Sequence, residues 1–380
     1  MKKIKTIFTI TFIIIIYTFM FITLTNNNEI STVEKRTLKT FPHFSLKTLI
    51  NGTYLDTLTT AFSDQIAFRD KLVKGYYLFQ FQRYNGDVVK GKNNELYSAY
   101  QRINNEDTYL ENVKQSTYNI NKVANEITQN NTKFIFLSIP RKDAVEKDNL
   151  PNSYISSDTI YTKSIDIVKQ NLNNNVILID AYELFNDKNI RYYYTNDHHI
   201  TPRGANILYN KIKQVTNDNR LKQNTLEDLY TIEKTLINGS FNNQLGQSIK
   251  PSLEELYLVP KFNINYTRYE NLKISNKKVY KKANTYEDSY MEGDNAFTII
   301  DTNRKNLPNI LYVGSSFTNI LEALSIHDFN KMISIDYRHN TSKNSINYYV
   351  KTYNIDYVVF IPSQSNDAFS YNMIKKHLGM

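Results

Sequence analysis

The chain has 380 residues, of which 41% are hydrophobic and 22% are charged, and this balance excludes an intrinsically disordered protein. The formal net charge is +9, but no block or stripe of Lys and Arg appears beyond the N-terminus, which argues against nucleic-acid binding. Cysteine is absent, so disulfides, thiolate zinc sites and a lipoprotein cysteine anchor are excluded.

The N-terminal segment predicts the compartment. Lys2, Lys3 and Lys5 precede an uncharged run over residues 6–28. About 20 apolar residues span a bilayer as a helix, and lysines ahead of such a helix stay in the cytoplasm. We therefore expect residues 1–28 to form an uncleaved signal anchor in the cell membrane, with a single pass and the remaining chain extracytoplasmic. A cleaved signal peptide is the competing interpretation, but a small-residue cleavage site is missing before Asn26.

Residues 29–95 are predicted to form a helical approach segment, because Leu55, Leu58, Phe62 and Ile66 recur at helical spacing. Residues 96–380 are predicted to form the main domain. Within it, residues 216–305 interrupt the pattern with short β-like pieces at 256–259 and 297–300, and predict an inserted, partly β subdomain.

The main domain alternates between apolar strands and helices. Continuous apolar strands that alternate with helices indicate an α/β fold with a parallel sheet covered on both faces, and sites in such sheets lie at the carboxyl ends of strands. Strands are expected at 133–139, 176–180, 310–313, 332–335 and 357–361, and helices at 109–127, 160–172, 202–215, 317–324, 342–353 and the C-terminus.

The sharpest local motif lies at residues 192–205, YYYTNDHHITPRGA. Thr201 and Pro202 form a good N-cap and first-turn pair, so a helix is expected to begin there. Asp197 and His199 then lie in the loop that enters this helix, and in an extended loop they point to the same side. Asp197 could bond one ring nitrogen of His199 and leave the other free as a base. The alternative is that these polar residues only cap the helix; for His198, support of the loop is the favoured role.

A nucleophile for this base is expected in residues 310–319, ILYVGSSFTN, where a strand, a glycine and two serines precede a helix. This order exposes Ser316 at the carboxyl end of a strand, near helix N–H groups that can stabilise an oxyanion. The pattern Gly314-x-Ser316 lacks the second glycine of a nucleophile elbow and is weak by itself. Ser315 is expected to be an N-cap; otherwise Gly314 and Ser315 are candidates to bind substrate or to support the site.

Arg141 and Lys142 follow the predicted strand at 133–139. Basic side chains at this end of a strand are expected to bind substrate or to support the site. A solvated loop is the alternative.

At these residues the sequence resembles the DHHW protein family, which is related to the SGNH-like alginate O-acetyltransferase proteins of bacterial envelopes. The resemblance covers nearly all of the chain beyond the anchor. It is carried by Glu34-Lys35-Arg36-Thr37-Leu38, Phe41-Pro42, Phe62-Ser63-Asp64-Gln65, Phe68-Arg69-Asp70, Pro140-x-Lys142, Asp197-His198-His199, Thr201-Pro202-x-Gly204-Ala205 and Gly314-x-Ser316.

The resemblance implies an SGNH-hydrolase-like fold and a triad of Ser316, His199 and Asp197. It implies transfer of an acyl group, which we expect to be acetyl, to a cell-envelope or exopolysaccharide, without a cofactor or a metal. It also implies a membrane-bound O-acyltransferase as a possible partner that supplies the acyl group. The sequence departs from the family pattern at Ile200, where the family name has Trp, and at Ser315, a position that is often Asp.

Three other functions remain as alternatives. The same triad serves an esterase that removes acyl groups from a polysaccharide. A chain with this fold could also be a non-catalytic polysaccharide-binding scaffold of an acetylation complex. A DHH-type metal-dependent phosphoesterase is disfavoured, because no Asp-x-Asp pair lies on a strand before Asp197 and the anchor places the domain outside.

Overall fold

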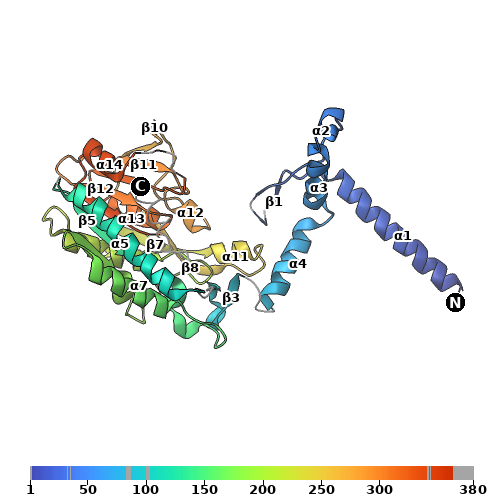
Figure 1. Ribbon diagram of the computed structural model, residues 1–380, viewed down its shortest axis with the longest axis horizontal. Coiled ribbons are helices and arrows are strands. Elements are labelled where there is room, and N and C mark those ends of the chain that lie inside the picture. Colours follow the sequence, from blue (N-terminus) through green and yellow to red (C-terminus); the bar gives the residue numbers. More distant parts are fainter. Residues whose placement is uncertain are drawn as a thin grey trace. The chain divides into compact units, whose positions relative to one another are not determined.

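The computed structural model describes residues 2–31, 33–34, 36–82, 87–99, 103–129, 131–339, 342 and 344–362. The chain forms two compact units (Figure 1). The first unit comprises Met1–Val88 and Asn242–Lys250, and the second comprises Val89–Phe241 and Pro251–Met380.

The first unit is mainly helical, and Leu55, Leu58 and Phe62 lie in one of its helices, α3. Among the described residues, α1 is the one helix that is long and apolar enough to span a membrane, and few of its residues are buried. This finding agrees with the predicted N-terminal transmembrane segment. The elements of this unit are α1 (Lys2–Thr25), β1 (Ile30–Ser31), β2 (Arg36–Thr37), α2 (Leu46–Ile50), α3 (Thr53–Gln65) and α4 (Arg69–Gln82).

The second unit is built on an eight-stranded sheet flanked by helices, which agrees with the predicted α/β fold. Its strands lie in the order β10-β9-β11-β13-β12-β14-β5-β6. They span β5 (Lys133–Ser138), β6 (Val176–Asp180), β9 (Thr267–Glu270), β10 (Lys273–Ile274), β11 (Phe297–Asp301), β12 (Asn309–Val313), β13 (Lys331–Ile335) and β14 (Tyr357–Phe360).

Five of the eight strands pair in parallel, as the alternating pattern predicts. These are β13, β12, β14, β5 and β6. The pairings of β13 with β11, β11 with β9 and β9 with β10 are antiparallel, so the sheet is mixed. The three antiparallel strands come from the segment 216–305, which therefore extends the main sheet instead of standing wholly apart. The same segment holds β7 (Tyr230–Ile237) and β8 (Ser252–Pro260), which form a separate two-stranded sheet.

Helices cover both faces of the sheet because successive strand side chains point to opposite sides. On β5, Phe134 and Phe136 pack with α5, α7 and α14, whereas Ile135 and Leu137 pack with α9 and α13. Figure 1 shows α5 and α7 along one side of the sheet. The longer helices are α5 (Glu106–Thr128), α7 (Asp158–Asn171), α9 (Pro202–Thr216), α13 (Phe317–Ser325) and α14 (Ile346–Tyr353).

Short elements connect this framework. They are β3 (Val88–Lys90), β4 (Leu96–Ser98), α6 (Lys142–Val145), α8 (Ala181–Leu184), α10 (Leu226–Leu229), α11 (Ser240–Gln244), α12 (Tyr286–Ser289) and the 3₁₀ turns η1 (Lys92–Asn94) and η2 (Lys147–Asn149).

Two helix starts are defined by side-chain caps, and one of them agrees with its prediction. Thr201 accepts a hydrogen bond from the Gly204 N–H, and α9 begins at Pro202. The helix expected from 342 begins at Ile346 instead, because the Ser345 side chain caps it. The predicted C-terminal helix lies outside the described residues.

Candidate active site

A short turn holds Asp197 and His199 in place. Tyr193 and Ile200 form an antiparallel bridge, and the Thr201 N–H donates to the Tyr192 carbonyl at 2.8 Å. Ile200, the residue that replaces the family's Trp, is fully buried in the core. The replacement therefore changes core packing beneath the turn and not a surface on which a sugar could stack.

Asp197 and His199 form a buried pair. The His199 Nδ1 atom lies 2.8 Å from Asp197 Oδ1, and the His199 backbone N–H donates to the same oxygen at 3.0 Å. Both residues are almost inaccessible to solvent. Because Asp197 accepts from Nδ1, the other ring nitrogen, Nε2, is left as a hydrogen-bond acceptor.

Ser316 completes the chain of contacts. Its Oγ atom lies 2.8 Å from His199 Nε2, although the two residues are 117 positions apart in sequence. Ser316 lies in the turn between the carboxyl end of β12 and the start of α13. Among the described residues, the Ser316 N–H has no hydrogen-bond partner.

The glycine two positions before Ser316 is required by close packing. A Cβ atom at Gly314 would lie 2.8 Å from the Ile361 carbonyl oxygen and 2.9 Å from the Thr318 methyl group. The expectation that Ser315 caps the helix is wrong, because Ser316 occupies the N-cap position and makes no side-chain cap. Ser315 is buried, and its carbonyl accepts hydrogen bonds from Thr318.

The inserted segment supplies two residues that sequence reasoning missed. The Ser240 N–H donates to Asp197 Oδ2 at 2.8 Å, and Ser240 Oγ donates to Asp197 Oδ1 at 3.0 Å. The one sequence signal is Gly239, where any side chain would collide with the Asn196 backbone. The Tyr286 ring stacks on the His199 ring with centroids 3.9 Å apart, and nothing in the local sequence indicates this contact.

His198 lies beside the pair and supports it. Its Nδ1 atom is 2.6 Å from Ser240 Oγ, and its ring centroid is 3.9 Å from that of His199. Because Ser240 Oγ donates to Asp197, His198 is connected to the carboxylate through Ser240. This position fits the predicted supporting role.

The pKa values follow from burial and from this contact. Burial by itself raises the pKa of Asp197, but the charge on His199 and the hydrogen bonds to the carboxylate outweigh burial and hold the pKa below its usual range. Burial lowers the pKa of His199, and the Asp197 carboxylate more than offsets this effect, so the pKa lies above the ordinary value of 6.5. The buried pair therefore favours a positive charge on His199 once it has accepted a proton.

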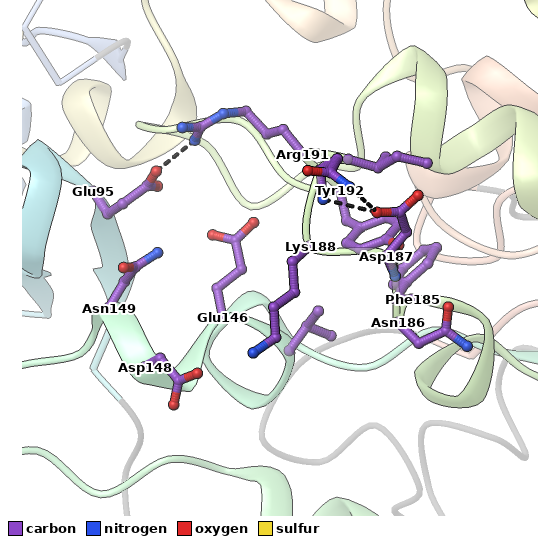
Figure 2. A pocket seen from close by; sticks show the side chains of 13 residues that line it. Glu95, Glu146, Asp148, Asn149, Phe185, Asn186, Asp187, Lys188, Arg191 and Tyr192 are labelled. Carbon is purple, nitrogen blue, oxygen red and sulfur yellow. Dashed lines mark hydrogen bonds and ion pairs between the residues drawn. The ribbon is translucent and has the colours of Figure 1, made fainter.

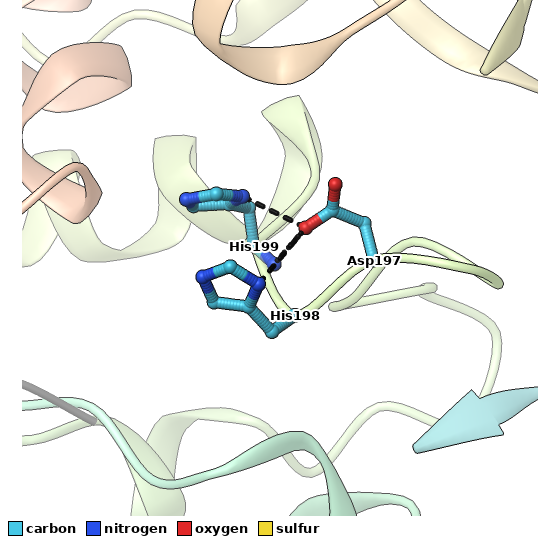
Figure 3. A group of neighbouring side chains, drawn as sticks. All are labelled: Asp197, His198 and His199. Carbon is cyan, nitrogen blue, oxygen red and sulfur yellow. Dashed lines mark hydrogen bonds and ion pairs between the residues drawn. The ribbon is translucent and has the colours of Figure 1, made fainter. Parts of the chain in front are cut away.

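Asp197, His198 and His199 bring three potential metal-ligand atoms within 4.8 Å of one another (Figure 3). Figure 3 shows both rings directed at one Asp197 oxygen. That carboxylate, however, accepts N–H bonds from His199 and Ser240 and an O–H bond from Ser240. N–H and O–H donors that point at the carboxylate favour a hydrogen-bonded arrangement over metal ligation.

Lys142 supports the turn that carries Asp197 and His199. It is buried, and its Nζ atom lies 2.7 Å from Glu95 Oε2 and donates to the carbonyls of Leu96, Tyr194 and Thr195. Its donors are thus directed at the protein and not at a substrate. Arg141 is partly buried and contacts Asp143 and the Ser98 carbonyl.

A cavity of about 580 Å³ borders the same turn (Figure 2). Figure 2 shows the Glu146 side chain in its middle and the Glu95–Arg191 ion pair at one side. Burial raises the pKa of Glu146 to about 7. The polar lining residues are Glu95, Glu146, Asp148, Asn149, Asn186, Asp187, Lys188, Asn189 and Arg191.

Fold and site together define the SGNH-like class of α/β proteins. A family model described as "SGNH hydrolase-like domain, acetyltransferase AlgX" matches residues 88–323. The chain therefore belongs to this family of SGNH-like acetyltransferases, which confirms the resemblance read from the motifs. A comparison with curated proteins gave no match.

Solved structures support the fold. Bacillus cereus PatB1 is 21% identical with a TM-score of 0.59, over 76% of this chain and 98% of that chain. Bacillus cereus PatB1 with a sulfonyl adduct is 20% identical with a TM-score of 0.61, over the same shares of the two chains. A DHHW family protein from Eubacterium siraeum is 18% identical with a TM-score of 0.60, over 76% of this chain and 93% of that chain.

Replacing Tyr286 by Phe tests whether this residue positions Ser316. The Tyr286 hydroxyl donates to the Ser316 carbonyl at 3.0 Å and accepts from the Ile320 N–H at 3.3 Å. The Phe variant keeps the ring on His199 but loses both contacts. We expect kcat for an activated acetyl ester to fall about tenfold with little change in KM, which corresponds to roughly 1.4 kcal/mol.

The Tyr290→Phe variant is the control for this measurement, since Tyr290 is an equally buried tyrosine of the same segment whose hydroxyl donates to the Leu256 carbonyl. Its kcat should stay close to that of the unmodified chain. Equal losses in both variants would mean that Tyr286 acts only through general stability.

Proposed function

We propose that the chain is an extracytoplasmic O-acyltransferase that transfers an acyl group, which we take to be acetyl, to a cell-envelope or exopolysaccharide. The observation that carries this proposal is the continuous hydrogen-bonded series from Asp197 through His199 to Ser316, with both side-chain contacts at 2.8 Å. Membership of the acetyltransferase family supports the choice of acetyl. Helix α1 is proposed to hold the protein in the cell membrane by a single pass, with residues 29–380 outside.

In the first half-reaction, Ser316 Oγ attacks the carbonyl carbon of an acetyl ester while His199 Nε2 takes its proton. In this proposal the Ser316 N–H donates to the oxyanion, because N–H groups at the start of a helix can stabilise negative charge. The donor's C–O bond then breaks, and the leaving oxygen takes the proton from His199. The product is an acetyl ester on Ser316.

In the second half-reaction, a sugar hydroxyl gives its proton to His199 and attacks the acetyl-serine carbonyl. The bond to Ser316 breaks, and Ser316 Oγ recovers the proton. We propose a membrane-bound O-acyltransferase as the source of the acetyl group.

The test is the intact mass of the full chain in detergent after incubation with an activated acetyl ester, followed by addition of an oligosaccharide. We expect one added acetyl group on the unmodified chain and none on Ser316→Ala. The matched control is Ser315→Ala, which removes the neighbouring buried serine and should leave the adduct unchanged.

The fate of the acetyl group separates the alternatives. Transfer to the oligosaccharide supports the transferase. Rapid release to water without transfer supports an esterase with the same triad. A chain that forms no adduct and turns over no ester would contradict both and favour the non-catalytic scaffold.

A further inference from the structure

Helix α4 carries a stripe of exposed apolar side chains. Phe68, which directly precedes the helix, and Leu72, Tyr76 and Phe79 follow one another at intervals of four, four and three residues, and each is more than half exposed. The spacing of Leu72, Tyr76 and Phe79 places these three residues on one face of α4, and Phe68 lies in the turn that leads into the helix. An exposed apolar stripe of this length indicates a surface that meets a partner.

The opposite face of α4 already has its partners. Tyr77 is partly buried and Phe81 is buried. Tyr77 and Lys74 lie against the chain at Gly246, where an added Cβ would contact both. The exposed stripe is therefore additional to the face that packs within this unit.

The stripe begins where the chain is tied to the end of α1. The Ala67 N–H donates to Thr23 Oγ1 at 3.0 Å, and the Asn26 side chain donates to the Gln65 carbonyl at 2.9 Å. The Gln65 side chain also pairs with the backbone of Asn28. Four hydrogen bonds to the last turn of α1 and the residues after it thus hold the segment directly before Phe68.

The length of α1 places this junction near a membrane surface. Its 24 residues correspond to about 36 Å at 1.5 Å per residue, slightly more than the roughly 30 Å of a hydrocarbon core. If α1 spans the bilayer, its last turn and the start of α4 lie between the acyl chains and the lipid headgroups. Figure 1 shows α4 turning away from the axis of α1 instead of continuing it.

The charge of α4 suits the same location. The helix contains Arg69, Lys71 and Lys74 against one acidic residue, Asp70. Arg69 is largely buried and pairs with Glu34, whereas Lys71 is exposed. The Lys71 Nζ atom lies 5.7 Å from the centre of the Phe68 ring, at the edge of the stripe. Interfacial helices combine an apolar face with lysine and arginine that meet lipid phosphates.

We propose that α4 lies in the membrane interface, with Phe68, Leu72, Tyr76 and Phe79 inserted among lipid headgroups and the upper acyl chains. This inference rests on the proposed anchoring role of α1. The partner is the lipid surface itself, so the first unit touches the membrane along α4 as well as through α1.

The chain contains no tryptophan, so single substitutions give unambiguous fluorescent probes. The full chain is reconstituted into vesicles of phosphatidylcholine and phosphatidylglycerol that contain lipids brominated high on the acyl chain. Phe79→Trp is the decisive variant, because Phe79 is the member of the stripe farthest from the attachment to α1. We expect its emission to be shifted to the blue and quenched as strongly as that of Phe68→Trp.

Two control variants locate a failure. Phe12→Trp, in the middle of α1, should be quenched by lipids brominated deep in the chain, and Tyr77→Trp, on the packed face of α4, should resist both lipids. If Phe12→Trp is not quenched, α1 does not span and the anchor itself is wrong.

If Phe12→Trp is quenched and Phe79→Trp emits as an exposed tryptophan, α4 stands away from the membrane and the inference is overturned. A blue-shifted Phe79→Trp that brominated lipids do not quench would overturn it too, because the stripe would then be covered by a second copy of the chain.

Discussion

Replacing Asp197 by Asn is expected to lower kcat for acetyl-ester turnover about 10⁴-fold while leaving the fold intact. Asp197 accepts hydrogen bonds from both N–H groups of His199 and from the N–H and Oγ of Ser240. An amide presents N–H donors on one side, which must oppose one of these donor groups. The arrangement that keeps the bond from the Ser240 N–H turns the amide N–H groups towards His199 Nδ1 and Ser240 Oγ, whose hydroxyl can accept instead. It fixes the His199 tautomer whose Nε2 carries a proton. That tautomer cannot take the proton of Ser316.

The pH dependence of kcat/KM tests the Asp197→Asn variant independently. His199 acts as a base only when it is neutral, and Asp197 raises its pKa above 6.5. In the unmodified chain, kcat/KM should therefore rise with pH through a midpoint above 6.5 and be lost as the pH falls below that midpoint. In Asp197→Asn, burial still lowers the pKa of His199 and the largest opposing interaction is gone, so the residual activity should have its midpoint at lower pH.

The control is Asp166→Asn, which changes an exposed carboxylate on α7 and should alter neither kcat nor the profile. A midpoint that is the same in Asp197→Asn and in the unmodified chain would contradict the assignment of His199 as the base.

Replacing Lys142 by Met is expected to lower the free energy of unfolding by about 3–5 kcal/mol, the range found when one partner of a buried ion pair is removed. The Lys142 ammonium group is buried and contacts the Glu95 carboxylate and three backbone carbonyls. Methionine fills most of the space but removes the Lys142 donors from the three carbonyls, of which that of Thr195 keeps its hydrogen bond from the Leu96 N–H. Glu95 then keeps only its ion pair with Arg191, at 2.5 Å.

Urea unfolding of the full chain in detergent, followed by circular dichroism, measures this loss. The matched control is Lys163→Met, since Lys163 pairs with Glu106 in an ion pair that is exposed on both sides. Exposed pairs contribute about 0–1 kcal/mol, so this variant should unfold close to the unmodified chain. Equal midpoints for the two variants would show that the buried pair does not hold the turn that carries Asp197 and His199.

Local patterns in the sequence were sufficient for most elements of the second unit. Apolar runs such as 176–180 predict strands because helices cover both faces of the sheet, and the observed β6, an edge strand, has the same bounds. Thr201 and Pro202 predict the start of α9 because capping depends on adjacent residues. The proximity of Asp197 to His199 is local in the same way, since two residues separated by one position in an extended turn face the same side.

The tertiary structure decided what joins distant residues. The sequence of the segment 216–305 indicates short strands, but their partners depend on packing, and β9, β10 and β11 extend the main sheet. The same segment brings Ser240 to Asp197 and Tyr286 to His199. Lys142 was predicted to bind substrate or to support the site, and only packing shows that its ammonium group is directed into the protein.

The sequence by itself thus determined the α/β pattern, the family, the apolar N-terminal helix and the residues of the candidate triad. Its tertiary structure decided that Ser316 Oγ lies within hydrogen-bond distance of His199 and that residues of the inserted segment contact both His199 and Asp197. The physical reason is that caps and hydrophobic periodicity act between near neighbours in the chain. A contact across 117 positions exists only after the parallel strands and their helices have packed.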